Sequence, residues 1–107
     1  MSEDLDVNET VDTSIQSITR SKLKTPKMFK VVLFNDNYTT KDFVVEILKI
    51  IFNKPELEAT KIMMDVHKSG QGICGIYTYD VATSKVNQVH RIARENGFPL
   101  RSGVEET

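Results

Sequence analysis

The sequence predicts a small α+β domain in which a short sheet is packed by helices, with the elements in the order βααβαβ. Three observations support this fold class. Residues 28–34 form a β-branched and aromatic run that is typical of a strand. Later segments carry apolar residues three or four positions apart, as helices do, and Gly97 with Pro99 marks the sharp end of the last helix. The 107 residues suffice for one domain and are too few for two.

The first strand is expected to end at Asn35-Asp36-Asn37, because short polar side chains bond to nearby backbone in turns. A helix is predicted from Thr39 to about Phe52. Thr39 takes the expected N-cap position, since Asp42 follows three residues later at capping-box spacing. The apolar face of this helix comprises Phe43, Val44, Ile47, Leu48 and Ile51.

Four further elements are expected: a helix from Pro55 to between Lys68 and Gly70, a strand over residues 73–78, a helix from Thr78 or Tyr79, and a short strand over residues 100–104. The last helix has the clearest end. Arg91 and Arg94 lie in its final turn, Gly97 suits the left-handed position after the cap, and Pro99 follows.

Residues 1–25 are predicted to form a flexible acidic N-terminal extension, and residues 26–107 the folded domain. The first 24 residues contain no aromatic side chain and bury too little apolar surface to offset the entropy of ordering them. Their acids are Glu3, Asp4, Asp6, Glu9 and Asp12. Pro26 marks the boundary, because proline disfavours a helical conformation in the residue before it.

Composition excludes several classes of protein. A formal net charge of -1 argues against nucleic-acid binding, which needs a basic face. No apolar run approaches the roughly 20 residues of a membrane span, and the N-terminus lacks the basic-then-apolar pattern expected of a signal peptide. The lone Cys74 cannot form an intramolecular disulfide, which suggests a reducing compartment. We therefore expect a soluble, cytoplasmic protein without nucleic-acid or membrane partners.

Few residues have the pattern of a catalytic or metal site. His67 and His90 fall on different predicted helices, and no CxxC, HxxxH or HExxH spacing accompanies them, so no metal or cofactor is expected. A small enzyme using His67 with Asp65 or Cys74 is one alternative. It is disfavoured, because a cysteine inside an apolar strand is usually a buried core residue.

A group of hydrogen-bond acceptors remains, with Asn35, Asp36 and Asn37 in one turn and His67 near the end of the second helix. From the residues alone, the favoured interpretation is structural. Asx clusters mostly shape turns, and His67 would lie at the edge of the core.

Four motifs nevertheless occur together: the NDxYT turn, the M-x-x-VH helix end, the G-x-x-ICG strand and the ARENGFPL tail. In this combination, over about Pro26 to Leu100, the chain closely resembles the ClpS family. That family comprises adaptors that deliver N-end-rule substrates to the Clp AAA+ unfoldase and its protease. The resemblance implies a compact α/β sandwich, similar to the C-terminal domain of the ribosomal stalk protein, behind a flexible N-terminal extension.

The resemblance also implies a non-enzymatic function, which is the binding of proteins through a free N-terminal Leu, Phe, Tyr or Trp. The positions matching the family's α-amine contacts are Asn35, Asp36, Asn37 and His67. The positions matching its hydrophobic pocket are Thr39, Lys41, Val44, Met63, Val66 and Leu100. The alternative is a protein-interaction module of the same fold that does not recognise N-terminal residues.

The chain departs from the family's commonest pattern at two of these positions. Many members carry an acid where this chain has Asn37, and the charge of Asp36 is expected to compensate in part. Many members carry methionine at the pocket entrance, where this chain has Lys41. Lysine keeps its ammonium in solvent while its stem lines the rim, so we expect Lys41 to disfavour a basic second residue in the substrate.

The family docks on the N-terminal domain of a Clp AAA+ unfoldase, ClpA-like or ClpC-like, and the matching positions are Asp80 and Lys85. From the residues alone, both are interpreted as solvated surface charges. The N-terminal extension corresponds, by position only, to the family's extension that approaches the unfoldase channel.

Overall fold

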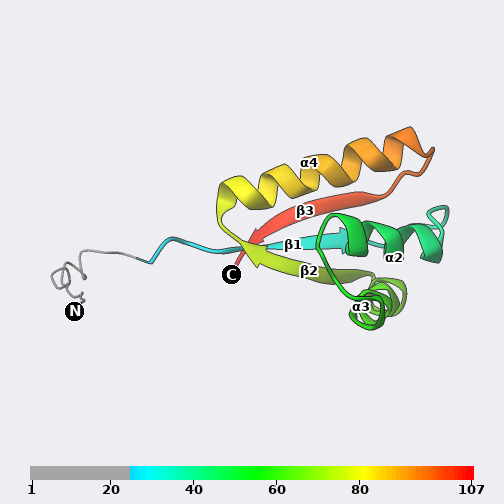
Figure 1. Ribbon diagram of the computed structural model, residues 1–107, viewed down its shortest axis with the longest axis horizontal. Coiled ribbons are helices and arrows are strands. Elements are labelled where there is room, and N and C mark those ends of the chain that lie inside the picture. Colours follow the sequence, from blue (N-terminus) through cyan, green and yellow to red (C-terminus); the bar gives the residue numbers. More distant parts are fainter. Residues whose placement is uncertain (1–24) are drawn as a thin grey trace, which may run out of the picture.

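The structure is a computed structural model that describes residues 25–107 (Figure 1). Residues 1–24, which make up nearly all of the extension predicted at residues 1–25, lie outside the described residues. The elements are β1 (Phe29–Phe34), α2 (Lys41–Ile50), α3 (Glu56–Ser69), β2 (Gln71–Tyr77), α4 (Tyr79–Glu95) and β3 (Arg101–Glu106). This order confirms the predicted α+β class.

The sheet has three antiparallel strands in the order β2-β1-β3, so β1 is central. Phe29, Val31 and Leu33 alternate toward the helices and join the hydrophobic core. In Figure 1, α4 runs along β3, whereas α2 and α3 gather near the end of β1. The packing of α2 on α3 and of α3 on β2 brings the turn after β1 close to the end of α3.

The start of α2 differs from the prediction. Its N-cap is Thr40, which has an extended backbone (φ -73°, ψ 152°) and accepts a hydrogen bond from the Phe43 amide. The assignment of Thr39 as the cap is wrong, because the Thr39 hydroxyl donates to Asp36 instead. The helix also ends two residues before the predicted Phe52.

Glycine ends α3 and sets the geometry of the next strand. Gly70 has a left-handed backbone (φ 91°), and its amide donates to the Val66 carbonyl. The chain reverses within this one residue, so β2 begins at Gln71, two residues before its predicted start. A Cβ at Gly72 would lie 2.8 Å from Cγ2 of Val66, which shows how closely β2 approaches α3.

The predicted end of α4 is confirmed. The Gly97 amide (φ 78°) donates to the Arg94 carbonyl, and the Phe98 amide donates to the Ala93 carbonyl, as in a Schellman motif. The final strand extends beyond the predicted residues 100–104 to Glu106, and it pairs with β1 along its whole length. Among residues 25–107, no helix is long and apolar enough to cross a membrane.

Candidate functional site

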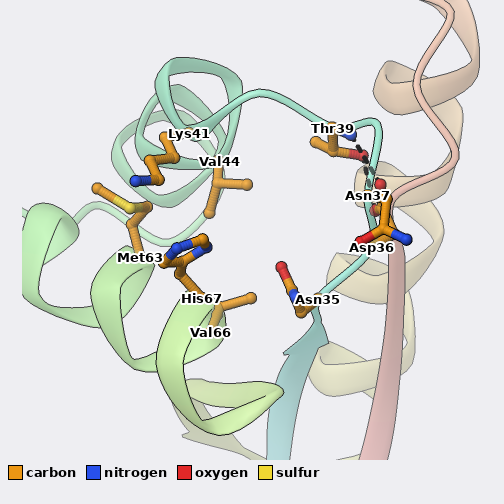
Figure 2. Close-up of a pocket in the computed structure, with 9 residues that line it drawn as sticks. All are labelled: Asn35, Asp36, Asn37, Thr39, Lys41, Val44, Met63, Val66 and His67. Carbon is orange, nitrogen blue, oxygen red and sulfur yellow. Dashed lines mark hydrogen bonds between the residues drawn. The ribbon is translucent and has the colours of Figure 1, made fainter.

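A cavity of about 230 Å³ lies between the turn after β1, the start of α2 and the end of α3 (Figure 2). Its lining residues are Asn35, Asp36, Asn37, Thr39, Lys41, Val44, Met63, Val66 and His67. The structure thus brings together in one cavity all the residues that the sequence assigned to α-amine binding, and all those assigned to the hydrophobic pocket except Leu100.

The polar wall of the cavity is held by Asp36. Its carboxylate accepts hydrogen bonds from the Tyr38 amide (2.8 Å), the Thr39 amide (2.7 Å) and the Thr39 hydroxyl (2.8 Å). Partial burial opposes ionisation of this carboxyl, but the three hydrogen bonds outweigh it and lower its pKa. Asp36 is therefore charged at neutral pH, and its oxygens are engaged within the turn.

One backbone hydrogen bond ties this turn to the end of α3. The Asn35 amide donates to the Gly70 carbonyl at 2.9 Å, immediately after the helix that carries His67. Figure 2 shows the Asn35 side chain across the cavity from His67, with Val66 below His67. Both polar side chains are exposed, so they are accessible to a ligand. No local pattern predicts this hydrogen bond, because its partners are 35 residues apart in the chain.

The apolar wall comes from two helices. Met63 and Val66 lie three positions apart on α3, with His67 in the next position, so all three share one helix face. Val44 completes the wall from the second turn of α2. Val44, Met63 and Val66 are each at most 9% exposed, which makes this wall an extension of the core.

Lys41 lies at the rim of the cavity. It is the first residue of α2, it is exposed, and Figure 2 shows its side chain beside Met63. Within residues 25–107, no carboxylate lies within 4.0 Å of its ammonium group. The rim therefore carries a positive charge that is not neutralised by an ion pair in the described part of the chain.

Leu100 is placed elsewhere. It is 3% exposed, belongs to the hydrophobic core, and borders a different hollow beside His90 and Arg94. It supports the fold near the start of β3 and does not line the cavity described above.

The two predicted docking residues have different environments. Asp80 is exposed in the first turn of α4, as expected. Lys85 is half-buried, and its Nζ donates to the Ile51 carbonyl at 2.8 Å. Its ammonium also lies 5.8 Å from the ring centroid of Phe52 and 5.3 Å from that of Tyr77. The interpretation of Lys85 as a solvated charge is therefore wrong, because it ties α4 to the end of α2.

The structure provides no thiolate nucleophile near His67. Cys74 is fully buried in β2, and burial raises its pKa to about 12, against the opposing charge of Lys54. The described residues contain no group of three or more His, Cys, Asp or Glu side chains that could hold a metal ion.

Comparisons with known proteins identify the family. Residues 24–103 match the family model described as "ATP-dependent Clp protease adaptor protein ClpS". The chain is 49% identical over 106 residues to the ClpS adapter of Syntrophus aciditrophicus, with 99% of each chain covered. It is 58% identical over 81 residues to that of Wolinella succinogenes, covering 76% of this chain and 79% of the relative.

A solved structure agrees with these relatives. The structure of Agrobacterium tumefaciens ClpS2 bound to L-phenylalaninamide matches with a TM-score of 0.75 and 34% identity, over 78% of this chain and all of that one. The relatives' names describe adaptors of a protease, which confirms the prediction of a non-enzymatic protein. The chain belongs to the ClpS family of ATP-dependent Clp protease adaptors.

Proposed function

We propose that the cavity between β1 and α3 binds the N-terminal residue of protein substrates that begin with Leu, Phe, Tyr or Trp. The protein then delivers these substrates to a Clp AAA+ unfoldase in the cytoplasm. The observation that carries this proposal is one cavity with polar acceptors on one wall and core-like apolar side chains on the other. The ligand of the A. tumefaciens ClpS2 structure, L-phenylalaninamide, has both matching parts, a free α-amine and an aromatic side chain.

The polar wall suits a protonated α-amine, which offers three N–H donors and one positive charge. Asn35, Asn37 and one ring nitrogen of His67 supply acceptors around the cavity. Each charge-assisted hydrogen bond contributes about 1.5–3 kcal/mol when water is excluded. Asp36 adds a negative charge, although its oxygens already accept hydrogen bonds from the turn. Acetylation of the amine removes the charge and leaves the acceptors without donors.

The apolar wall suits the first side chain of the substrate. Burial of a Leu or Phe side chain against Val44, Met63 and Val66 contributes about 1.5–3 kcal/mol, whereas alanine leaves the space unfilled. After the loss of translational and rotational freedom, we expect a dissociation constant of about 1 μM.

Delivery requires a second surface. Support for docking through the start of α4 comes from the exposure of Asp80 and from the sequence resemblance at Asp80 and Lys85. The partner is a ClpA-like or ClpC-like N-terminal domain. The N-terminal extension is proposed to reach toward the unfoldase channel.

The test is a binding measurement with a fluorescent peptide that begins with Phe, compared with its acetylated form and with a form that begins with Ala. We expect micromolar affinity for the first peptide only. Equal affinity for all three, or no binding, would mean a docking module of this fold without N-terminal recognition.

The variant His67→Ala tests the contribution of the polar wall to peptide binding. Because His67 is exposed, we expect its loss to weaken binding of the Phe peptide by about tenfold or more while leaving the thermal melt nearly unchanged. Lys68→Ala is the control, since Lys68 is the next residue of α3, is also exposed and does not line the cavity. A melt lowered in step with the lost binding would instead assign His67 a structural role.

A further inference from the structure

Two more hollows lie close to the turn that forms the polar wall of the cavity. One, of about 420 Å³, is lined by Phe34, Asn35, Asp36, Pro99 and Arg101. It shares Asn35 and Asp36 with the candidate cavity, so the two hollows flank the same turn. The other, of about 280 Å³, shares Pro99 and Arg101 with the first and continues to His90 and Arg94 on α4. The molecule therefore has a series of depressions that runs from the candidate cavity toward the end of α4.

The far end of this series is basic. Arg94 and Arg101 both border the hollow of about 280 Å³, and no acidic residue is among its lining residues. Within residues 25–107, no carboxylate lies within 4.0 Å of either guanidinium group, whereas Arg91 on the same helix pairs with Glu95 at 3.6 Å. Arg94 and Arg101 are thus positioned to pair with a carboxylate that comes from another molecule.

His90 is fixed by the fold. Its Nε2 accepts a hydrogen bond from the Ser102 amide at 3.0 Å, which assigns the proton of the neutral ring to Nδ1. The histidine therefore holds the start of β3 against α4, and the arginines supply the positive charge of this hollow.

The distance from the candidate cavity to Arg101 is short. Phe34 and Arg101 are partners in the sheet register, and neighbouring strands lie about 5 Å apart. Asn35 follows Phe34 by one residue, about 3.8 Å along the chain, so its Cα lies within about 9 Å of that of Arg101. An extended peptide advances about 3.3–3.6 Å per residue. A substrate held by its amine beside Asn35 can therefore bring its third or fourth residue over Arg101.

We propose that Arg101, together with Arg94, forms a second subsite that favours acidic side chains at the third and fourth positions of the bound substrate. This inference rests on the proposed function of the first cavity. Asp36 borders both the candidate cavity and the hollow that contains Arg101, but its oxygens already accept hydrogen bonds within the turn. Arg101 is therefore the charge in that hollow that has no ion-pair partner among residues 25–107. The occupant is the substrate's own chain, because the subsite continues from the cavity that holds its first residue.

The experiment compares three unacetylated peptides that all begin with Phe. The first has Glu at its third and fourth positions, the second has Gln there, and the third has the same composition as the first but carries its two Glu residues near the C-terminus. Binding is measured by fluorescence anisotropy at low and at high ionic strength, with the acetylated form of each peptide as the blank. The protein is tested as the wild type, Arg101→Gln, Arg94→Gln and Arg91→Gln.

The wild type is expected to bind the first peptide about threefold more tightly than the second and the third, because exposed ion pairs are weak. High salt should remove the difference. Arg101→Gln should also remove it and leave the affinity for the second peptide unchanged, and Arg94→Gln should reduce it. Arg91→Gln is the matched control and should keep the full preference, since Arg91 does not border this hollow.

Equal affinity of the wild type for all three unacetylated peptides, with none for their acetylated forms, would overturn the second subsite and leave the proposed function standing. A preference for the first peptide that persists in Arg101→Gln would also overturn the second subsite. The same conclusion would follow if the first and third peptides bound equally tightly and both bound more tightly than the second, because net charge and not position would then decide the affinity. Absence of binding by every peptide would instead overturn the proposed function, and the second subsite with it.

Discussion

The three Asx residues after β1 have different environments, although the sequence groups them in one turn. Asp36 is engaged by the amides of Tyr38 and Thr39 and by the Thr39 hydroxyl. Asn35 is fixed through its backbone to Gly70, which leaves its side chain facing His67 (Figure 2). Asp36 thus shapes the wall of the cavity, and the exposed amide side chains of Asn35 and Asn37 are the groups that we propose to contact the ligand.

The pKa of Asp36 leads to a prediction about stability. Its folded-state pKa is lowered, so its ionisation stabilises the fold above the unfolded-state value of about 3.9, and this contribution is lost as the pH falls through the folded-state pKa. Asp36→Asn should lower the free energy of unfolding by about 1 kcal/mol at neutral pH, and the difference from the wild type should shrink in acid. Urea denaturation of both proteins at neutral pH and in acid measures this difference in the free energy of unfolding.

Asp65→Asn serves as the control for Asp36→Asn, because Asp65 is exposed on α3 and does not belong to the turn that Asp36 holds. Its stability difference from the wild type should be small and should not follow the same pH dependence. A loss of stability in Asp36→Asn that is equal in acid and at neutral pH would contradict a role for the charge of Asp36.

Lys41 carries a prediction about substrate choice. Its ammonium has no partner within the described part of the chain, and it lies at the rim of the cavity. We expect the wild type to bind a peptide that begins Phe-Glu about two- to fivefold more tightly than one that begins Phe-Lys, which corresponds to about 0.4–1 kcal/mol. Lys41→Met should remove most of this preference. Equal affinities of the wild type for the two peptides would contradict the prediction.

At the scale of elements, the junction of α3 with β2 positions the apolar wall. Gly70 reverses the chain in a left-handed conformation, and Gly72 then lets β2 lie directly against Val66 and Ile62 of α3. Because Val66 also lines the cavity, the packing that joins α3 to the sheet also sets the position of the apolar wall.

Gly72→Ala should therefore affect both stability and binding. The added Cβ would lie 2.8 Å from Cγ2 of Val66 and 3.1 Å from the Ile62 carbonyl oxygen, so α3 must shift away from β2. Overpacking of this kind costs about 1–3 kcal/mol of stability. A thermal melt first identifies a temperature at which the variant is fully folded. At that temperature, we expect fluorescence anisotropy to show weaker binding of a peptide that begins with Phe than in the wild type.

Gly97→Ala is the matched control for this variant. Gly97 also has a positive φ (78°), but no atom lies within 4 Å of its would-be Cβ, and it lies beyond α4, away from the cavity. Backbone strain should cost about 1 kcal/mol of stability without changing the affinity for the peptide. Equal losses of affinity in the two variants would show that destabilisation alone explains the effect of Gly72→Ala.

At the scale of the whole molecule, Lys85 connects elements that are distant in the sequence. It bridges from α4 to the carbonyl of Ile51 after α2, beside the rings of Phe52 and Tyr77. Lys85→Met keeps the apolar stem and removes the charge, so it should lower the free energy of unfolding by about 1–2 kcal/mol. Lys68→Met, at an exposed site, should change it little. Equal urea midpoints for the two variants would contradict this structural role.

This role also bears on the proposed docking surface. A Lys85 variant that fails to bind the unfoldase can fail because the surface has moved, whereas the exposed Asp80 does not have this second role. Asp80→Ala is therefore the cleaner variant for mapping that contact.

The sequence by itself determined the order of the elements, the ends of α3 and α4 and the residues of the core, because these follow from local rules. Apolar periodicity, the capping glycines and the β-branched run act over a few neighbouring residues. The N-cap of α2 was misassigned by one residue, because Thr39 and Thr40 are both suitable caps and only the position of Asp36 distinguishes them. The candidate site itself came from the family motifs, since the residues alone favoured a simple turn.

Only the tertiary structure decided which of these residues share a cavity. The meeting of Asn35 with His67 depends on the hydrogen bond to Gly70 and on the packing of α3 against β2, and neither is encoded in any single segment. The same holds for Leu100, which the fold places in the core behind another hollow, and for Lys85, whose charge is held inside the molecule. Contacts across many residues of sequence are set by the packing of the whole chain, because local patterns fix which face of an element is buried but not what it meets.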